Sequence, residues 1–361
     1  MTLGRVAAVA GVLLALGPWG GLVPPVRGAG TASCRRVLLA DSAALAFSAA
    51  WSADGREVVL VDVPGGRLLR YDRDGRFLGS VARPGEGGTE FSKPTQIHAT
   101  AKGFLLRNSA RKWIWLDRAF KSLESVSAMD PEGYPVFNLA DEVLTGDELA
   151  GFGSYQKSRR VWAMGLLRVG LKPLAVREVV EEIDISSKTG SFHNTLAPLV
   201  AQAAGRAYSL RFGEPPYLLG LHPKVRLKAF PAGFASLPAL PENQGPQTTA
   251  PRQKAIEKSS LPVGLYGSRQ FLYLLTHRPE PGGLLWQLHQ IDPVRDKLVR
   301  SLTLPTTAHS LVIAPGSETW AVFEKGAVLP TGEQPVESLL LIPSAWIESP
   351  GAKGPSRLAC S

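Results

Sequence analysis

The sequence predicts an all-β fold in which six antiparallel units close into a ring, and three observations support this. Runs rich in β-branched and aromatic residues alternate with Gly- and Pro-containing turns along most of the chain. Two stretches in its first half match each other at a fixed offset. The two cysteines, Cys34 and Cys360, lie near opposite ends of the predicted mature chain. Together these features predict a six-bladed β-propeller of four-stranded antiparallel blades whose termini meet.

The first 28 residues have the pattern of a signal peptide. Arg5 precedes an apolar run over residues 6–16. A run of this length suits a signal core, whereas a membrane-spanning helix, or an uncleaved anchor, needs roughly 20 apolar residues. Small residues follow, so cleavage is expected after Gly28 or as late as Ala32. We therefore expect an exported protein, periplasmic or extracellular, that does not span the membrane after cleavage.

Cys34 and Cys360 are expected to form a disulfide, because an oxidising compartment favours pairing of two lone cysteines. Pairing requires Cα atoms within roughly 7 Å, so it predicts that the chain ends meet. Two free thiols are the alternative. Lipid anchoring at Cys34 is disfavoured, because Thr31 stands where a lipidation motif has Leu, Val or Ile.

Six β-rich units follow one another along residues 34–361, which we assign to a single domain. The pairs Asp72-Arg73 and Asp117-Arg118 match at an offset of 45 residues. Leu78 and Leu123 match at the same offset. A pair of β-sandwiches does not explain this period, whereas radial repetition does. The six units cover residues 58–81, 104–126, 161–174, 206–221, 271–291 and 319–342.

A resemblance to a known family rests on the junction between the first two units. Gly88, Phe91, Pro94 and Ile97 recur at the spacing of the inter-blade signature of NHL repeats, which this segment resembles. The strand and turn of residues 67–77 are similar to the end of such a blade. The resemblance covers about residues 50–125 and implies a six-bladed propeller of the NHL/TolB-like kind. That family includes binding modules, scaffolds and some metal-dependent enzymes, so the resemblance implies no single activity.

Residues 231–262 depart from the repeat and are rich in Pro, Gln, Ser and Thr. Turns between strands are usually about 2–6 residues long, so this segment predicts a surface insertion between the fourth and fifth blades. Its function could be that of a lid or partner-binding loop, and a tolerated insertion is the alternative.

Motifs with a defined chemistry are absent from the sequence, so no catalytic residue is assigned. There is no GxSxG, HExxH, phosphate-binding GxxxxGK[ST] or EF-hand pattern. The Asp-rich turn at Asp72 and Asp74 ends in Gly75 between apolar strands, which is typical of a hairpin turn and not of a calcium loop.

Three histidines are candidate metal ligands. His98, His193 and His309 each precede or begin a predicted innermost strand, in alternate blades. Three imidazoles around a channel would suit a catalytic zinc ion. Their distances to the next strand differ widely along the sequence, which favours separate structural roles. No cofactor is predicted, with zinc or calcium in the central channel as the alternative.

Two further sets of residues alternate along predicted strands. Trp113 and Trp115 are expected to pack between blades, and contact with a carbohydrate ligand is the alternative. Lys224, Arg226 and Lys228 predict an outermost strand with a cationic solvent face, which blocks edge-to-edge aggregation. A stripe that binds polyanions is the alternative.

The charge balance argues against a nucleic-acid partner. The formal net charge is +9 and falls to +7 without residues 1–28, which carry Arg5, Arg27 and no acid. This is a mild field for a chain of 361 residues. We therefore hypothesise an exported, monomeric, non-catalytic propeller that acts as a binding module or scaffold for a protein, peptide or glycan at its channel mouth. A metal-dependent lyase or hydrolase with a central-channel site is the alternative.

Overall fold

The computed structural model describes residues 34–39, 48–85, 90–109, 111–158, 161–184, 186–187, 192–193, 196, 199–234, 237–241, 246–281, 283–327, 336–348 and 360. The predicted signal peptide, residues 1–28, and its cleavage region lie outside these residues. None of the helices formed within them has both the length and the apolar character that a bilayer crossing requires.

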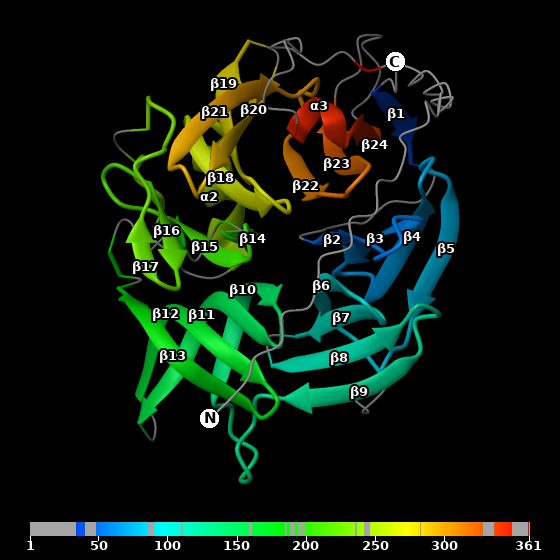
Figure 1. Cartoon of the computed structure of the whole chain (residues 1–361), viewed down its shortest axis with the longest axis vertical. Helices are drawn as coiled ribbons and strands as arrows, with labels where there is room; N and C mark the ends of the chain where they lie inside the picture. Colours follow the sequence, from blue (N-terminus) through cyan, green and yellow to red (C-terminus); the bar gives the residue numbers. More distant parts are fainter. Residues whose placement is uncertain are drawn as a thin grey trace, which may run out of the picture. The chain divides into compact units, whose positions relative to one another are not determined.

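Six four-stranded antiparallel sheets stand as blades around a central axis (Figure 1). The all-β, six-bladed propeller predicted from the sequence is therefore confirmed. From the innermost to the outermost strand, blade one contains β2 (Ala49–Trp51), β3 (Glu57–Asp62), β4 (Arg67–Asp72) and β5 (Phe77–Ala82). Blade two contains β6 (Pro94–Thr100), β7 (Gly103–Asn108), β8 (Lys112–Asp117) and β9 (Ser122–Ser127). Blade three contains β10 (Phe137–Thr145), β11 (Glu148–Ser158), β12 (Val161–Leu171) and β13 (Leu174–Ile183).

The second half of the ring follows the same plan. Blade four contains β14 (Val200–Ala203), β15 (Arg206–Arg211), β16 (Tyr217–Leu221) and β17 (Lys224–Arg226). Blade five contains β18 (Leu261–Gly267), β19 (Leu272–Glu280), β20 (Gly283–Asp292) and β21 (Lys297–Thr303). Blade six contains β22 (Ser310–Ala314), β23 (Thr319–Ala327), β24 (Val336–Pro343) and, as its outermost strand, β1 (Arg35–Leu38).

The two ends of the described chain meet in blade six. Strand β1 pairs with β24 in antiparallel register, with Arg35 opposite Leu341 and Leu38 opposite Ser338. The short helix α3 (Ser344–Glu348) follows β24 directly. The outermost strand of the last blade thus comes from the start of the domain, which confirms the predicted closure by the termini.

The apolar core is divided among the junctions between blades. Six buried clusters are found among the described residues, and each draws its members from two neighbouring blades. The largest fully buried side chains include Trp113 between blades two and three and Trp320 between blades five and six. A single twisted sheet cannot cover both of its faces, so each blade depends on its neighbours for burial.

The 45-residue offset seen in the sequence extends to irregularities of the strands. In blade one the β4–β5 register skips Leu78, and in blade two the β8–β9 register skips Leu123. Both leucines are exposed bulge residues, at 49% and 57%. A β-bulge leaves one residue without a partner across the ladder, so the repeat encodes the same local kink twice.

The turns before these bulges are also equivalent. Asp72 accepts hydrogen bonds from two backbone N–H groups of its own turn, at 2.8 and 2.9 Å. Asp117 does the same at 2.9 and 2.7 Å. Gly75 and Phe120 occupy the matching left-handed positions, with φ of 83° and 61°. The Asp72 carboxylate is thus part of a hairpin turn, as predicted.

The segment 231–262 follows β17 and leads into β18, and it thereby connects blades four and five. It contains helix α2 (Pro246–Glu257), and its last residues open β18. Leu237 and Ile256 are buried in the cluster between blades four and five. The described part of this insertion therefore packs onto the propeller through these apolar side chains.

Candidate functional site: the central channel

A cavity of about 570 Å³ lies on the axis of the ring. All six innermost strands contribute to its wall, with the turns that follow several of them. Ten of the residues that line the wall are small, namely Ser48, Ala49, Ala50, Ala99, Ala201, Ala203, Ala204, Gly205, Gly267 and Ser268. Small residues at the inward positions keep the channel open where larger side chains would fill it.

The innermost strands approach one another closely beside the cavity. A Cβ atom on Gly267 of β18 would collide with the backbone carbonyl oxygen of Gln202 on β14. Glycine at this position therefore permits backbone contact between blades four and five. Gln202 itself lines the cavity, as does Arg269 in the turn after β18.

A buried polar network lies at the channel wall on the side of blades two and three, where its members Gln96 and Glu142 line the cavity. Arg107 Nη1 lies 3.0 Å from Glu142 Oε2, and its Nη2 donates to Gln96 Oε1 at 3.0 Å. The same guanidinium donates to the carbonyl oxygens of Leu139 and Ala140. These carbonyls lie where the β10–β11 register is interrupted, so Arg107 of blade two holds the irregular part of β10 in place.

Asp141 connects three blades. Its Oδ2 accepts hydrogen bonds from the backbone N–H groups of Leu199 and Val200 in blade four, at 2.5 and 2.9 Å. Its Oδ1 accepts from Gln96 Nε2 of blade two at 3.2 Å. Burial raises the pKa of Asp141 to about 6, although the two backbone N–H groups stabilise its charged form.

His98 and Glu142 form a pair at the cavity wall. His98 Nε2 lies 3.5 Å from Glu142 Oε1, and both residues line the cavity. Trp113 Nε1 donates to the same Glu142 oxygen at 3.4 Å. Burial disfavours the charged form of Glu142, but the charge of Arg107 together with the contacts from His98 and Trp113 outweighs burial and holds the pKa of Glu142 below its usual value. The arrangement presents an imidazole, backed by a carboxylate, to the channel.

The other two predicted histidines lie elsewhere. His193 is buried between Phe152 and Phe212, and its Nε2 lies 2.6 Å from Arg211 Nη1. His309 is an exposed residue immediately before β22. Within the part of the chain that the structure describes, no three His, Cys, Asp or Glu side chains gather as a metal-binding group. The three histidines therefore do not fit the shared zinc site that their alternation by blade suggested.

The two tryptophans of β8 lie between blades two and three. Trp113 is fully buried and packs against Phe137, with ring centroids 5.7 Å apart. Trp115 is partly buried against the same cluster, and Lys172 Nζ lies 5.3 Å from its ring centroid. A fully buried indole has no free face on which a sugar could stack. Trp113 thus has the inter-blade packing role that the sequence favoured, and Trp115 packs against the same cluster while remaining partly exposed.

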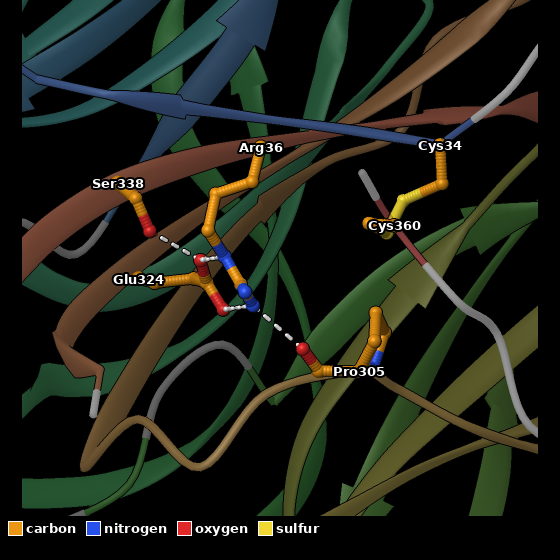
Figure 2. The surroundings of a disulfide bond; sticks show 6 residues. All are labelled: Cys34, Arg36, Pro305, Glu324, Ser338 and Cys360. Atoms are coloured by element: carbon orange, nitrogen blue, oxygen red, sulfur yellow. Dashed lines mark hydrogen bonds and ion pairs between the residues drawn. A yellow bond between two sulfur atoms is a disulfide. The ribbon is translucent and has the colours of Figure 1, made fainter. Parts of the chain in front are cut away.

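The predicted disulfide between Cys34 and Cys360 is confirmed (Figure 2). The Cα atoms are 4.5 Å apart although the residues are separated by 326 positions. Cys34 is fully buried in the cluster between blades five and six. Its sulfur is bonded to Cys360, and this leaves no thiol for a thioether-linked lipid.

The polar network was not predicted from the sequence. One signal was available, because Asp141 and Glu142 are two adjacent acids within the otherwise largely apolar strand β10. A second was the repeat itself, since Gln96 and Asp141 are separated by the same 45 residues that relate the first two blades and their side chains touch.

Comparisons with known proteins show the fold. No family model matches the chain, and no curated protein is similar to it. A member of the DUF4221 family from Bacteroides vulgatus has a TM-score of 0.55 at 10% identity, over 86% of this chain and 96% of that one. A gluconolactonase from Xanthomonas campestris has a TM-score of 0.47 at 12% identity, over 86% and 90% of the two chains. Regucalcin, a calcium-binding protein from Agrobacterium tumefaciens, has a TM-score of 0.48 at 13% identity, over 85% and 92%. Identities this low carry no information about a shared activity.

Proposed function

We propose that this protein is an exported, non-catalytic binding module that takes a protein segment, peptide or glycan at the mouth of its central channel. The observation that carries the proposal is the cavity of about 570 Å³ enclosed by all six innermost strands. Ligand sites in proteins commonly have volumes of roughly 300–1,000 Å³. The cavity therefore suits a chain end or a few sugar units and not a whole folded partner.

The cavity wall supplies both room and polar contacts. His98 Nε2 faces Glu142, which leaves Nδ1 for a ligand; Gln202 and Arg269 add a carboxamide and a guanidinium. Such a mixture of a few polar groups on a wall of small and apolar side chains is typical of a site that orients a ligand by hydrogen bonds.

Calorimetric titration of the mature protein with a panel of short peptides and of neutral and acidic oligosaccharides tests this function. Replacement of the exposed cavity residue Ala99 by Trp (Ala99→Trp) should abolish the heat of binding, because the indole would fill the mouth. Ala250→Trp, at an exposed position of helix α2 away from the channel, is the matched control. Mass spectrometry of the recovered ligand should find it unchanged, and a product would contradict the non-catalytic role.

Export is supported by the Cys34–Cys360 disulfide, since disulfides persist in oxidising compartments, and by the signal-like residues 1–28. The intact mass of the protein recovered from the periplasm or medium would give the cleavage site. Cleavage after residue 28 or 32 is expected, and retention of the leader in the cytoplasm would contradict export.

A lyase or hydrolase that uses the channel is a second candidate, favoured by the His98–Glu142 pair. Elemental analysis of the purified protein tests its metal-dependent form, with stoichiometric zinc or calcium expected. Loss of that metal in a His98→Ala variant would place the ion in the channel.

We also propose that the first two blades are NHL repeats. The proposal is supported by the equivalent bulges at Leu78 and Leu123 and by Phe91, which is fully buried between these blades. Pro94 is the first residue of the innermost strand of blade two, which is the position expected for the proline of the NHL-like signature. Structures of unambiguous NHL proteins test the proposal, since they should have the same two bulges at the same positions.

A further inference from the structure

Each blade ends in an outermost strand whose outer edge pairs with no other described strand. Five of these six strands carry charged residues, as exposed edges commonly do to prevent pairing with other chains. The charged strands are β1 (Arg35, Arg36), β9 (Glu124), β13 (Arg177, Glu178, Glu181, Glu182), β17 (Lys224, Arg226) and β21 (Lys297, Arg300). Strand β5, with the sequence FLGSVA, has none.

Strand β5 is apolar as well as uncharged at its edge. Phe77 and Leu78 are 40% and 49% exposed, and no residue between Phe77 and Ala82 is fully buried. An unpaired row of backbone N–H and C=O groups without a protecting charge is a template for an added strand.

The bulge at Leu78 gives this edge a second feature. Regular pairing with β4 resumes at Gly79 and continues to Ala82, so four residues of the edge remain in register. Leu78 itself lies at the rim of a hollow of about 290 Å³ between blades one and two. Three guanidinium groups line that hollow, those of Arg56, Arg70 and Arg118, against the two carboxylates of Asp54 and Glu57.

Arginines also stand at both ends of the uncharged strand. Arg76 precedes β5 and Arg83 follows it, and neither makes an ion pair with another described residue. The side chain of Arg56 is 85% exposed, and its Nε lies 3.9 Å from Asp54 Oδ2. Arginines therefore stand at each end of the β5 edge and beside the hollow, where Arg70 pairs with Glu57.

An added strand at this edge could come from a second copy of this chain or from a different protein, and the arginines distinguish the two. Antiparallel pairing of two copies of β5 would bring Phe77 opposite Ala82 and therefore Arg76 opposite Arg83. Parallel pairing in register would place each arginine opposite its own copy. Like charges directly across a strand pair are destabilising, so a second copy of this chain is disfavoured.

We propose that the β5 edge binds an extended, acidic segment of a partner protein by strand addition. Four residues of the partner would pair with Gly79–Ala82, and acidic side chains on either side would meet Arg76 and Arg83. The proposal does not depend on the channel function, because it concerns the rim of blade one and not the axis of the ring.

Two fluorescent synthetic peptides test the proposal. One has alternating threonine and valine in its centre with glutamates at both ends, and the other has the same centre with lysines at both ends. The glutamate peptide should bind the mature protein with a salt-sensitive anisotropy change, and the lysine peptide should not. The double variant Arg76→Glu/Arg83→Glu should weaken the glutamate peptide about tenfold and should gain affinity for the lysine peptide.

A matched charge reversal elsewhere on the surface shows whether peptide affinity depends on the arginines beside β5 or only on the net charge of the protein. Lys228→Glu/Lys297→Glu makes the same change on exposed residues of blades four and five and should leave peptide affinity unchanged. Amide exchange should slow at Gly79–Ala82 when the glutamate peptide is present. Equal loss of affinity in both double variants, protection of other residues instead, or self-association of the wild-type protein through β5 would overturn the proposal.

Discussion

Arg36 Nε lies 3.0 Å from Glu324 Oε2, across 288 positions of the sequence (Figure 2). Arg36 Nη2 donates to Glu324 Oε1 at 3.1 Å and to the Pro305 carbonyl at 2.6 Å. The Ser338 hydroxyl donates to the same carboxylate. Because Arg36 is on β1 and Glu324 on β23, this ion pair fastens the first strand to the blade that the chain forms last. It complements the disulfide, which joins the residue before β1 to the C-terminal region.

Removal of this arginine is expected to destabilise ring closure. Glu324 is fully buried at its side chain, and Arg36→Ala would leave that carboxylate without its counter-charge. Loss of one partner of a buried pair costs roughly 3–5 kcal/mol, and the 19% exposure of Arg36 places the expected loss near the lower end, at about 3 kcal/mol. Urea unfolding monitored by tryptophan fluorescence measures it.

The neighbouring residue provides the control for that experiment. Arg35 pairs with Asp74 at 3.0 Å, but both side chains are nearly half exposed. Exposed pairs contribute about 0–1 kcal/mol, so Arg35→Ala should change the unfolding free energy little. Equal losses in the two variants would mean that pairing with Glu324 does not stabilise closure.

Reduction of the Cys34–Cys360 disulfide is expected to destabilise the protein strongly. The bond closes a loop of 326 positions, for which the chain-entropy model gives a nominal upper value of about 5–6 kcal/mol. Urea unfolding of the protein with and without reductant, and of Cys34→Ala/Cys360→Ala, measures the loss. Thiol titration of the unreduced protein in denaturant should find no free thiol, and two reactive thiols would contradict the bond.

The sequence predicted most of the ring because the blades repeat. The offset that aligns Leu78 with Leu123 also aligns their bulges, and the matching Asp72 and Asp117 fix matching turns. The polar network could not be predicted in the same way. Arg107 reaches Glu142 from a different blade, and its role depends on a register interruption in β10 that no residue pattern announces.

The histidines show the same limit. His98 lies within an innermost strand, whereas His193 precedes its strand by several residues and turns into an apolar junction beside Phe152 and Phe212. Strand order along the sequence therefore assigned a blade to each histidine correctly. It could not assign a height along the channel, because the connecting segments differ in length and path.

Asp141→Asn is expected to change how stability depends on pH. The pKa of Asp141 is raised by burial to about 6 in the folded state, so the native protein binds a proton more tightly than the unfolded chain between about pH 4 and 6. Proton binding by Asp141 contributes on the order of 3 kcal/mol to the free energy of unfolding. This contribution is fully present below about pH 4 and is lost as pH rises through about 6.

Melting temperatures of the wild type and Asp141→Asn between pH 4 and 8 measure this effect. The variant carries a cost at every pH, because its amide would donate toward Gln96 Nε2, which is itself a donor. The difference between the two proteins should nevertheless shift in favour of the variant as pH rises. Asp147→Asn, at an exposed turn, should leave the pH dependence as it is. If the melting temperatures of the wild type and Asp141→Asn changed equally with pH, the raised pKa of Asp141 would be refuted.

His277→Phe is expected to stabilise the protein, most of all below neutral pH. His277 is 3% exposed and packs against Trp286 with ring centroids 5.1 Å apart. Neither ring nitrogen has a hydrogen-bond partner among the described residues. Burial lowers its pKa to about 4, so the unfolded chain binds more protons between about pH 4 and 6.5 and stability falls as pH falls through that range. Removing an unpaired buried polar group should gain about 1–3 kcal/mol.

His289 makes the comparison specific, because burial also lowers its pKa to about 4. Its two nitrogens lie 2.8 Å from Thr276 Oγ1 and 2.7 Å from Ser301 Oγ. His289→Phe would leave the buried Thr276 hydroxyl without this partner, so it should destabilise the protein at pH 8, where His277→Phe stabilises it. Thermal unfolding at pH 5 and 8 distinguishes the two variants. Destabilisation by both at pH 8 would show that His277 has a polar partner that stabilises the fold.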